Sequence, residues 1–336
     1  MMEKIEKKRL AILRVLKNAD DPLTGAKVAE KLAANGIEIS ERTVRLYLKD
    51  LEEEGLTRNF GKRGRRVTES GLRELAAAGG IEKVGFLSAK IDQMTYRMDF
   101  DLNRKSGTVV VNITLVDLHD LISVLPLICR VFEERYTMGR LVALFQPGER
   151  VDDILVPEGK LGLATVCSIT LNGVLLQSGI PTNSRFGGLL EIRRKDPTRF
   201  VEIITYDGTS LDPLEVFIRS GMTDYLGAIT TGNGRIGASF REFPSASQRR
   251  VEEIARELEE VGLGGLLRIG NPGQSLFDIP VSEGRIGAVV IGGLNPVAVL
   301  EETGRRVYSR ALAGLIEFDR LFPYTELNRE VGKLSR

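Results

Sequence analysis

Residues 40–51 read Ser-Glu-Arg-Thr-Val-Arg-Leu-Tyr-Leu-Lys-Asp-Leu, and residues 55–68 read Gly-Leu-Thr-Arg-Asn-Phe-Gly-Lys-Arg-Gly-Arg-Arg-Val-Thr. The first stretch predicts an amphipathic helix with Ser40 as its N-cap and Gly55 just past its C-terminus. The second predicts a basic hairpin that turns at two glycines, and residues 69–72 can begin another helix. Helix, hairpin and helix in this order are typical of a winged helix-turn-helix domain.

The predicted helix has two different faces. Its apolar residues recur from Val44 to Leu51 on one side, whereas Arg42, Arg45 and Lys49 fall on the other at spacings of three and four. Arginines on such an outer face can contact guanine edges in the major groove, and basic side chains on the hairpin suit phosphates. We therefore expect double-stranded DNA as the partner, contacted by Arg42, Thr43, Arg45, Lys49, Lys62, Arg63, Arg65 and Arg66.

A solvated charged helix beside a basic turn would give the same charge pattern, and winged helices also serve as protein-docking modules. The helix order, the capping and the basic hairpin together favour DNA binding. Two upstream helices, predicted over residues 2–18 and 24–35, complete a DNA-binding domain that we expect to span residues 1–78.

Charge is distributed unevenly along the chain. Residues 1–80 hold 17 Lys/Arg against 13 Asp/Glu, whereas the remainder holds 30 against 33. Five of the nine residues 58–66 are basic and none is acidic. This concentration of positive charge at the hairpin is expected of a nucleic-acid-binding module.

The composition of the 336 residues argues against several classes of protein. Two cysteines and one histidine can form neither a Cys/His zinc cluster within one chain nor a disulfide framework. The N-terminus lacks an apolar signal-peptide core, and the uncharged stretch at residues 286–300 is too short to span a bilayer. We therefore expect a cytoplasmic protein with no metal, no cofactor and no membrane partner.

The remainder of the chain contains an internal repeat at an offset of 125 residues. Glu158–Gly162 recurs as Glu283–Gly287, and Ser184-Arg185 recurs as Ser309-Arg310. A Pro-Gly pair and a single glycine also recur at this offset without a gap. This agreement predicts a duplicated domain.

We expect an α+β regulatory and dimerisation domain over residues 81–325, joined to the first domain by a hinge at residues 76–80. Its repeats cover about 90–205 and 215–325, and the order β-α-β-β-α-β in each is that of a ferredoxin-like motif. Two such units would most simply pack about a pseudo-twofold axis with a cleft between them. The predicted strands are 96–102, 109–116, 141–145, 161–168, 187–193, 225–230, 235–240, 266–269, 286–291 and 314–319, and the predicted helices are 121–132, 174–177, 247–261 and 296–302.

Amides, hydroxyls and arginines gather near paired glycines in the first repeat, and the second repeat has similar residues in equivalent places. Such groups would suit an anionic small molecule, which exposed backbone N–H groups could also contact. Alternatively, the Asn/Gly pairs form turns and the Ser-Arg pairs hold the two halves together. The candidate effector-binding residues are Thr170, Asn172, Asn183, Ser184, Arg185, Asn295 and Arg310.

Two further patterns occur in enzymes, but in this sequence neither of them indicates catalysis. Gly232–Gly237 spells G-x-G-x-x-G, but the residues that follow continue a strand instead of beginning the helix that a dinucleotide requires. Cys167 lacks an evident base, since the single histidine, His119, lies on a helix of the same repeat. Because Gly292 stands at the equivalent position of the second repeat, we interpret the thiol as filling a strand. We expect no catalytic residues.

The motifs resemble those of the archaeal NrpR-type nitrogen-regulation repressors. The resemblance rests on residues 55–72, Val166–Gly173, Gly179–Glu191 and Tyr206–Pro213, and it covers roughly residues 5–325. It implies a dimeric repressor that binds inverted-repeat operators, with a regulatory domain whose binding of 2-oxoglutarate lowers the affinity for DNA. Some family members carry two regulatory domains, whereas this chain has one that is itself duplicated.

The sequence thus predicts a homodimeric, ligand-responsive transcriptional repressor with 2-oxoglutarate as its effector. Half-sites for such a dimer lie about one helical turn or a multiple of it apart, so a small rotation of one winged helix is enough to misalign it. The alternatives are a small-molecule-binding enzyme or a protein-docking module that carries an appended winged helix.

Overall fold

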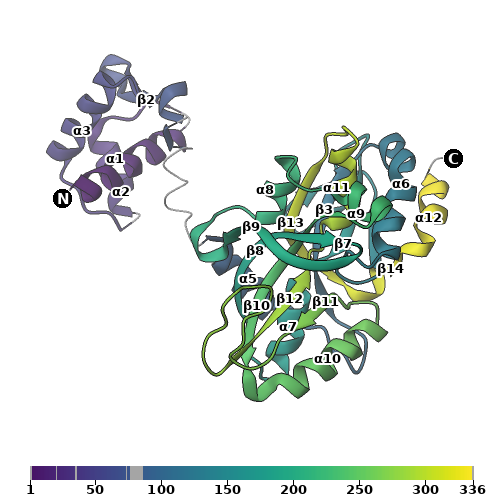
Figure 1. The fold of residues 1–336 in the computed structure, drawn as a ribbon. Coiled ribbons are helices and arrows are strands. Elements are labelled where there is room, and N and C mark those ends of the chain that lie inside the picture. The colour runs from purple at the N-terminus through teal and green to yellow at the C-terminus, as the bar shows by residue number, and fades with distance from the viewer. Residues whose placement is uncertain (1, 20, 35, 73, 76–85, 335–336) are drawn as a thin grey trace. The chain divides into compact units, whose positions relative to one another are not determined.

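The computed structural model describes residues 2–19, 21–34, 36–72, 74–75 and 86–334 (Figure 1). The chain divides into two compact units, Met1–Val84 and Gly85–Arg336, and each unit has its own cluster of buried apolar residues. The predicted hinge at residues 76–80 lies outside the described residues.

The first unit is the winged helix-turn-helix that the sequence predicts. Its elements are α1 (Met2–Lys17), α2 (Gly25–Ala34), α3 (Glu41–Glu53), β1 (Thr57–Asn59), a 3-10 turn at Gly61–Arg63, β2 (Arg65–Val67) and helical residues at 69–72 and 74–75. Apolar residues of all three helices, among them Ile12, Val28 and Leu48, are fully buried against one another. The amphipathic pattern of each helix thus places its charged face outward.

Local signals fix the ends of these elements. The Ser40 hydroxyl oxygen accepts a hydrogen bond from the backbone N–H of Thr43 (3.2 Å), and Gly55, in the left-handed region at φ +75°, ends α3. Gly64 has φ +106°, and a Cβ there would lie 2.2 Å from the backbone of Leu23. Only glycine therefore allows the hairpin to pack this closely on the segment before α2.

Within the described residues, the second unit contains two five-stranded antiparallel sheets and a small hairpin. The first sheet has the order β13-β3-β7-β4-β14 and the second β11-β12-β10-β8-β9. The strands are β3 (Thr108–Val116), β4 (Leu141–Phe145), β5 (Arg150–Val151), β6 (Ile154–Leu155), β7 (Leu161–Val166), β8 (Asn183–Arg193), β9 (Asp196–Thr205), β10 (Gly234–Pro244), β11 (Leu266–Ile269), β12 (Arg285–Ile291), β13 (Tyr308–Glu317) and β14 (Phe322–Pro323).

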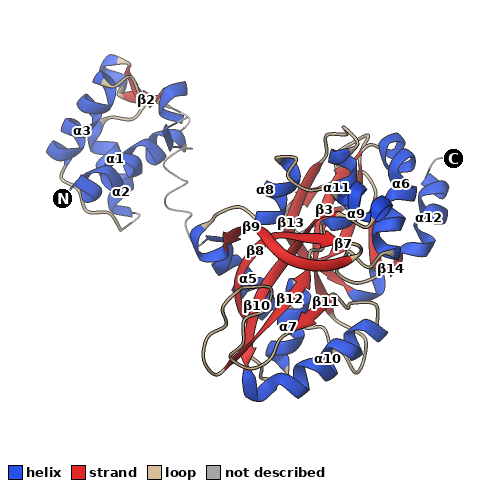
Figure 2. Cartoon of the chain, in the orientation of Figure 1, coloured by secondary structure: helices blue, strands red, loops and turns tan. Residues whose placement is uncertain are grey.

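Helices lie around the two sheets of this unit and alternate with the strands along the chain (Figure 2). They are α5 (Phe86–Arg97), α6 (Leu118–Glu133), α7 (Ile169–Gln177), α8 (Pro213–Arg219), α9 (Tyr225–Thr231), α10 (Gln248–Glu260), α11 (Asn295–Glu302) and α12 (Leu327–Leu334). Residues 169–175 of α7 and 295–300 of α11 are all buried, whereas α10 is amphipathic and packs through Val251, Ile254 and Leu258. Within the described residues, no helix has the length and apolar character needed to cross a membrane.

The two predicted repeats show the same order of elements, but they exchange their last helix and strand. β8 of the first repeat pairs with β10 of the second, and β13 of the second pairs with β3 of the first. Likewise α7 packs on α10, and α11 packs on α6. Each sheet is thus completed by the other repeat, which differs from the expected packing of two self-contained units across a cleft. The duplication itself stays a prediction.

Two of the predicted strands are wrong. Residues 225–230 form helix α9, because Asp224 accepts a hydrogen bond from the N–H of Gly227 (2.9 Å) as its N-cap and Gly232 ends it at φ +74°. These caps outweigh the strand preference of the β-branched residues between them. Residues 96–102 are the end of α5 followed by a loop, in which Asp101 and Ser106 form an isolated bridge.

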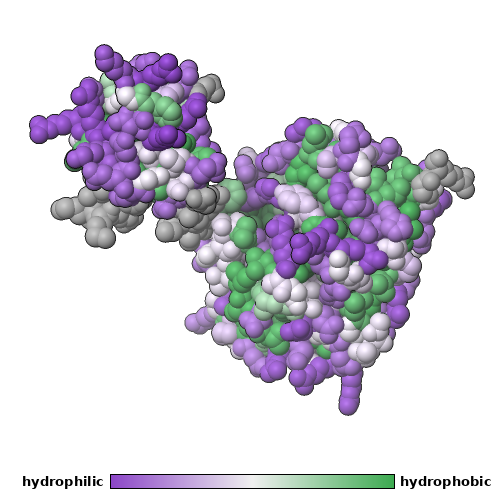
Figure 3. Space-filling model, turned by 90° about the horizontal axis from the view of Figure 1, so that it is seen from above, coloured by the Kyte–Doolittle hydropathy of each residue, from purple (hydrophilic) through white to green (hydrophobic). Residues whose placement is uncertain are grey.

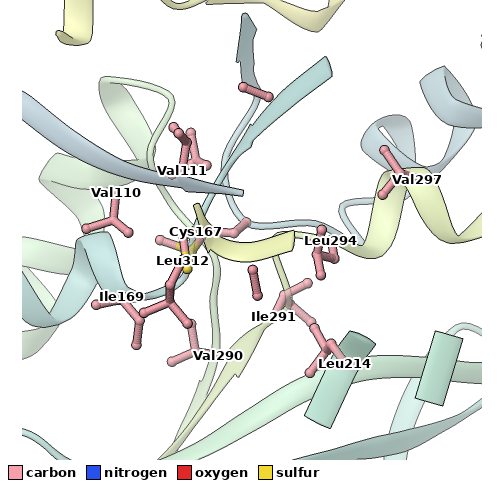
Figure 4. Close-up of a cluster of buried hydrophobic side chains, with 14 of the residues drawn as sticks. Val110, Val111, Cys167, Ile169, Leu214, Val290, Ile291, Leu294, Val297 and Leu312 are labelled. Carbon is pink, nitrogen blue, oxygen red and sulfur yellow. The ribbon is translucent and has the colours of Figure 1, made fainter. Parts of the chain in front are cut away.

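The core of the unit lies where the two sheets meet (Figure 4). Val110 and Val111 of β3 and Ile169 of α7 approach Val290 and Ile291 of β12, and all five are buried. The two sheets therefore share one continuous apolar interior.

Candidate nucleic-acid interface and ligand cavity

Helix α3 presents the cationic face that the sequence predicts. Arg42, Arg45 and Lys49 are exposed, while Val44 and Leu48 on the opposite side are fully buried. Arg45 pairs with Glu41 (2.5 Å) and Lys49 with Glu53 (3.6 Å), both one helical turn away. Exposed pairs of this kind contribute little to stability, so both cations can exchange their partner for a phosphate or a base.

Thr43 has a different environment from its basic neighbours. Its hydroxyl lies 2.8 Å from that of Ser40, inside the N-cap of α3. We therefore interpret Thr43 as part of the cap that orients the first turn of the helix.

The basic residues of the hairpin differ in whether their side chains have a partner. Lys62, Arg63 and Arg66 are exposed, and within the described residues their side chains make no hydrogen bond or ion pair. Arg65 instead donates from Nε and Nη2 to one carboxylate oxygen of Glu52 (3.0 and 2.8 Å). Its backbone also exchanges both hydrogen bonds with Leu23. Arg65 thus fastens the hairpin to α3, while the other three are exposed to solvent. The face of this unit seen in Figure 3 is largely hydrophilic.

In the second unit, Asn172 and Ser184 come together around a buried arginine that the sequence analysis missed. The Asn172 amide donates to the Ser184 hydroxyl (3.0 Å) and accepts from the guanidinium of Arg241. Arg241 is fully buried and also donates to the carbonyl and hydroxyl oxygens of Ser168 (2.8 Å each). Burial lowers the pKa of Arg241 to about 10. The polar cluster here binds the two Nη groups of a buried cation, whose Nε has no partner among the described residues.

Arg185 is held by a buried carboxylate. Its Nη1 donates to Glu242 (2.8 Å) and to the carbonyl oxygen of Pro280 (2.6 Å), and its guanidinium lies 5.5 Å from the ring centre of Phe240. The side chain of Glu242 is 1% exposed. Since a buried carboxylate requires such partners, Arg185 has a structural role in this arrangement. Asn183, beside it at the start of β8, is exposed.

Thr170 and Asn295, equivalent at the offset of 125, are both buried. The Thr170 hydroxyl donates to the carbonyl oxygen of Val110 (3.0 Å) and accepts from its N–H (3.2 Å). The Asn295 amide donates to the carbonyl oxygens of Gly237 and Tyr136 (2.8 Å each). Each side chain thus fastens the first turn of a buried helix to neighbouring backbone.

Arg310 is the candidate residue that lines a large cavity. The cavity has a volume of about 560 Å3 and lies among α5, β13 and the turn between β5 and β6. Arg310 donates to the Tyr308 hydroxyl (3.3 Å), and within the described residues it has no carboxylate within 4 Å. The lining residues are Phe86, Ala89, Lys90, Gln93, Met94, Asp152, Asp153, Arg310 and Ala313.

Lys90, on α5, is the second cation of this cavity and was not singled out from the sequence. It is half-buried, and burial, followed by the charge of Arg310, lowers its pKa. Within the described residues it makes no hydrogen bond or ion pair. The signal that could have found it is the repeat: the offset of 125 places Lys90 at the position of Glu215, an unusual reversal of charge between equivalent helices.

A smaller cavity of about 20 Å3, between the two sheets, has room for one water molecule. Cys167, Tyr206 and Asp212 line it. Burial raises the pKa of the Cys167 thiol to about 11, and Figure 4 shows its sulfur near Leu312 in the apolar core. Burial, followed by the charge of Glu215, raises the pKa of Asp212 to about 7. A protonated, enclosed thiol agrees with its interpretation as a core residue.

Comparison with known proteins adds the family. A family model described as NrpR regulatory domains NRD1 and 2 matches residues 84–322. The chain belongs to the NrpR family. A second model, the ribonuclease R winged-helix domain, matches residues 10–75 and agrees with the fold of the first unit.

The relatives carry consistent names. The global nitrogen regulator NrpRI of Methanosarcina mazei is 35% identical over 318 residues, which cover 95% of this chain and 98% of the relative. The global nitrogen regulators NrpR of Methanococcus maripaludis and Methanocaldococcus jannaschii are 31% and 30% identical over 87% and 98% of this chain. This NrpR chain spans only 51% and 57% of those two proteins.

A solved structure also resembles this chain. The crystal structure of a nitrogen repressor-like protein from Methanococcus jannaschii matches 70% of this chain and 97% of its own, with a TM-score of 0.60 and 26% identity. The family resemblance inferred from the sequence motifs is therefore confirmed, and the architecture of an NrpR regulatory domain applies to residues 84–322.

Proposed function

We propose that this NrpR protein is a homodimeric transcriptional repressor of the cytoplasm, which binds inverted-repeat operator DNA and loses affinity for it when 2-oxoglutarate binds. One observation carries the proposal: a capped helix with three exposed cations and a basic hairpin are joined in one chain to an NrpR regulatory domain. The relatives named global nitrogen regulators support the physiological part of it.

The DNA-binding step follows from the first unit. α3 enters the major groove, where Arg42 and Arg45 reach base edges and Lys49 neutralises phosphate. Lys62, Arg63 and Arg66 on the hairpin contact the backbone of the same half-site. Arg65 takes part indirectly, because its ion pair with Glu52 sets the angle between the hairpin and the helix.

The regulatory step requires two winged helices held at a fixed spacing by a dimer. An effector that binds one conformation of the regulatory domain more tightly shifts the population toward it. A change in the separation or orientation of the winged helices then lowers the affinity for an operator whose half-sites have a fixed spacing.

The test is a fluorescence-anisotropy titration of the protein onto the DNA upstream of its own gene, with and without millimolar 2-oxoglutarate, at two salt concentrations. We expect salt-dependent binding that the metabolite weakens. Arg45→Ala should weaken specific binding by roughly 1–3 kcal/mol. Arg249→Ala, which removes an exposed arginine of α10, is the matched control and should change nothing.

Each other outcome has a meaning of its own. Specific binding that ignores 2-oxoglutarate would retain the repressor and reject the effector. Binding no tighter than to unrelated DNA, at either salt concentration, would favour a protein-docking module. Equal effects of Arg45→Ala and Arg249→Ala would exclude α3 as the recognition helix.

A further inference from the structure

We propose that Leu46, on the cationic face of α3, specifies a T·A base pair in each half-site by contacting the 5-methyl group of thymine in the major groove. The inference rests on the proposed function, in which α3 enters that groove, and it adds a base that the basic side chains do not read. It is supported by the exposure of this leucine, by the charges around it and by the way in which its neighbour Arg45 is held.

Leu46 is an apolar residue on a face of α3 that is otherwise charged. Its side chain is 57% exposed, whereas Leu48 and Leu51 on the opposite side of the helix are buried. A single exposed leucine is common on protein surfaces and has no significance by itself. Here its position matters, because Arg42 precedes it by about one helical turn and Lys49 follows it by nearly the same distance.

The arginine next to Leu46 is held at the side of the helix. A Cβ at Gly25, the first residue of α2, would lie 2.8 Å from Cγ of Arg45, so the stem of this arginine rests on α2. Its guanidinium group pairs with Glu41, one helical turn back toward the N-terminus. Arg45 therefore lies near the start of both helices and leaves the side chain of Leu46 open to a ligand.

The charges around Leu46 indicate what covers it. Arg42, Arg45 and Lys49 are all exposed on the same face. A second copy of this chain would have to place an apolar group against the leucine and compensate three cations at the same time. Double-stranded DNA meets both requirements, because its phosphates line the groove and a methyl group lies inside it. Charge complementarity thus favours DNA as the occupant.

The chemistry of a leucine side chain selects one base. The 5-methyl group of thymine is the apolar group that base edges present in the major groove, whereas guanine, adenine and cytosine present hydrogen-bonding groups there. Leu46 has no donor or acceptor to offer, so against one of these bases it would displace water without replacing its hydrogen bonds. The leucine therefore favours thymine by contact and disfavours the other bases by desolvation.

The spacing on α3 places this thymine relative to the base that Arg42 reads. Four residues correspond to about 6 Å along a helix axis, and successive nucleotides of one strand are about 3.4 Å apart. We therefore expect the thymine within about two base pairs of the guanine contacted by Arg42. Leu46 also lies in the N-terminal half of α3, which is the part of a recognition helix that approaches base edges.

Replacing single thymines by deoxyuridine tests the contact, since it removes one methyl group and leaves base pairing unchanged. The probe is a duplex of the sequence that the full chain protects upstream of its own gene, with each thymine of one half-site replaced in turn. Affinity is measured by fluorescence anisotropy. We expect one position at which uracil weakens binding by the parent about fourfold, the value of one buried methyl group. Leu46→Ala should bind the thymine and uracil duplexes equally well.

Matched variants and a second base analogue sharpen the test. Leu46→Met retains an apolar side chain and should keep most of the preference for thymine. Leu155→Ala removes a leucine of β6 that is 49% exposed, and as the control it should keep the whole preference. With C·G in place of this T·A pair, 5-methylcytosine should bind more tightly than cytosine to the parent, but not to Leu46→Ala. Thermal unfolding of each variant establishes that folded protein is titrated.

The failures can be told apart. If the parent binds its protected sequence specifically but binds every uracil duplex as tightly as the thymine duplex, this inference is wrong and the proposed function stands. If Leu46→Ala keeps the fourfold preference, another residue contacts the methyl group. If that variant also sediments as a smaller species, the leucine belongs to a contact between copies, and the inference is again wrong. If the parent binds no DNA specifically, the proposed function fails and this inference fails with it.

Discussion

Arg185 and Arg310 stand 125 residues apart, at matching positions of the two predicted repeats of the second unit, yet only one of them is held. Arg185 donates to the buried carboxylate of Glu242, while Arg310 lines a cavity of about 560 Å3 without an ion pair among the described residues. The difference originates in the pairing of the strands: Asn183, two residues before Arg185, is opposite Glu242, whereas Arg310 is opposite Ile113, four residues before Asp117. The same residue type in the same motif thus has a structural role in one place and an unsatisfied charge in the other.

The hairpin of the first unit shows the same contrast between neighbours. Arg65 is fixed by Glu52, whereas Arg66 is exposed without a partner among the described residues. A basic residue that the fold already compensates contributes to position, and one that it leaves uncompensated can contribute to binding. The comparison therefore separates two kinds of arginine in both units, and each kind can be tested.

The largest expected effect is on stability. Removing one partner of a fully buried ion pair costs roughly 3–5 kcal/mol. Because the Arg185 side chain is 31% exposed and Arg285 still approaches Glu242, we expect roughly 2–3 kcal/mol for Arg185→Ala. Arg310→Ala should change the free energy of unfolding by less than about 0.5 kcal/mol. Urea denaturation at pH 7, followed through the transition of the second unit, measures both.

A second substitution shows whether Glu242 is the cause. In the Arg185→Ala background, Glu242→Gln should recover part of the lost stability, because the neutral amide no longer needs a cation. Equal losses for Arg185→Ala and Arg310→Ala would mean that the two arginines are alike and that the comparison is wrong.

Whether an element can be predicted from the sequence also depends on whether nearby or distant residues hold it in place. The winged helix was predictable because its signals are local: Ser40 caps α3, and Gly64 stands where the hairpin packs on the backbone of Leu23. The exchange of α7 and β8 with α11 and β13 between the two sheets was not predictable. The sequence offset of 125 is the same whether each strand completes the sheet of its own repeat or that of the other repeat. Helix α9 is not evident from the sequence because its β-branched residues favour a strand, whereas the caps at Asp224 and Gly232 favour a helix.

The candidate site was only partly predictable for a related reason. The repeated Ser-Arg motif identifies Arg310 as a candidate, but it identifies Arg185 equally well, and the distinction depends on the pairing of the strands, which brings a buried carboxylate to Arg185 and not to Arg310. Lys90 belongs to no motif, and its significance comes from the burial and the cavity that the fold creates around it.

The two repeats also differ in acid–base behaviour. Asp212 stands at the position of Leu87 in the first repeat, and burial beside Glu215 raises its pKa to about 7. Because the folded state binds the proton more tightly than the unfolded state, Asp212 lowers stability as the pH rises from about 4 to about 7.

Asp212→Asn keeps a good N-cap for α8, which the Asp212 carboxylate now provides through the N–H of Leu214 (2.9 Å). The variant should gain about 1 kcal/mol over the parent at pH 8 relative to pH 5, which is half of what the part of the shift above pH 5 implies for a fully enclosed group, because this side chain is partly accessible. Urea denaturation at the two pH values gives the difference. The same difference between variant and parent at both would contradict a raised pKa.

The hairpin offers a smaller effect that distinguishes its two arginines. Arg66→Ala should reduce the slope of log affinity against log salt by about one, since it removes one phosphate contact. Arg65→Ala should leave that slope unchanged and weaken binding at every salt concentration, because it frees the hairpin from Glu52. Anisotropy titrations at four salt concentrations measure both slopes. A reduced slope for Arg65→Ala, with an unchanged melting temperature, would show that it contacts phosphate after all.

The smallest expected effect concerns Asp117, which stands 125 residues before Glu242. Strand pairing places Arg310 opposite Ile113, whereas Asn183, two residues before Arg185, is opposite Glu242. One added methylene therefore does not bring the carboxylate of residue 117 to Arg310. Asp117→Glu should keep the exposed pair with Lys160 and change the free energy of unfolding by less than about 0.5 kcal/mol, as measured by urea denaturation at pH 7. A larger gain in stability would mean that the length of this side chain, and not the pairing of the strands, separates the two arginines.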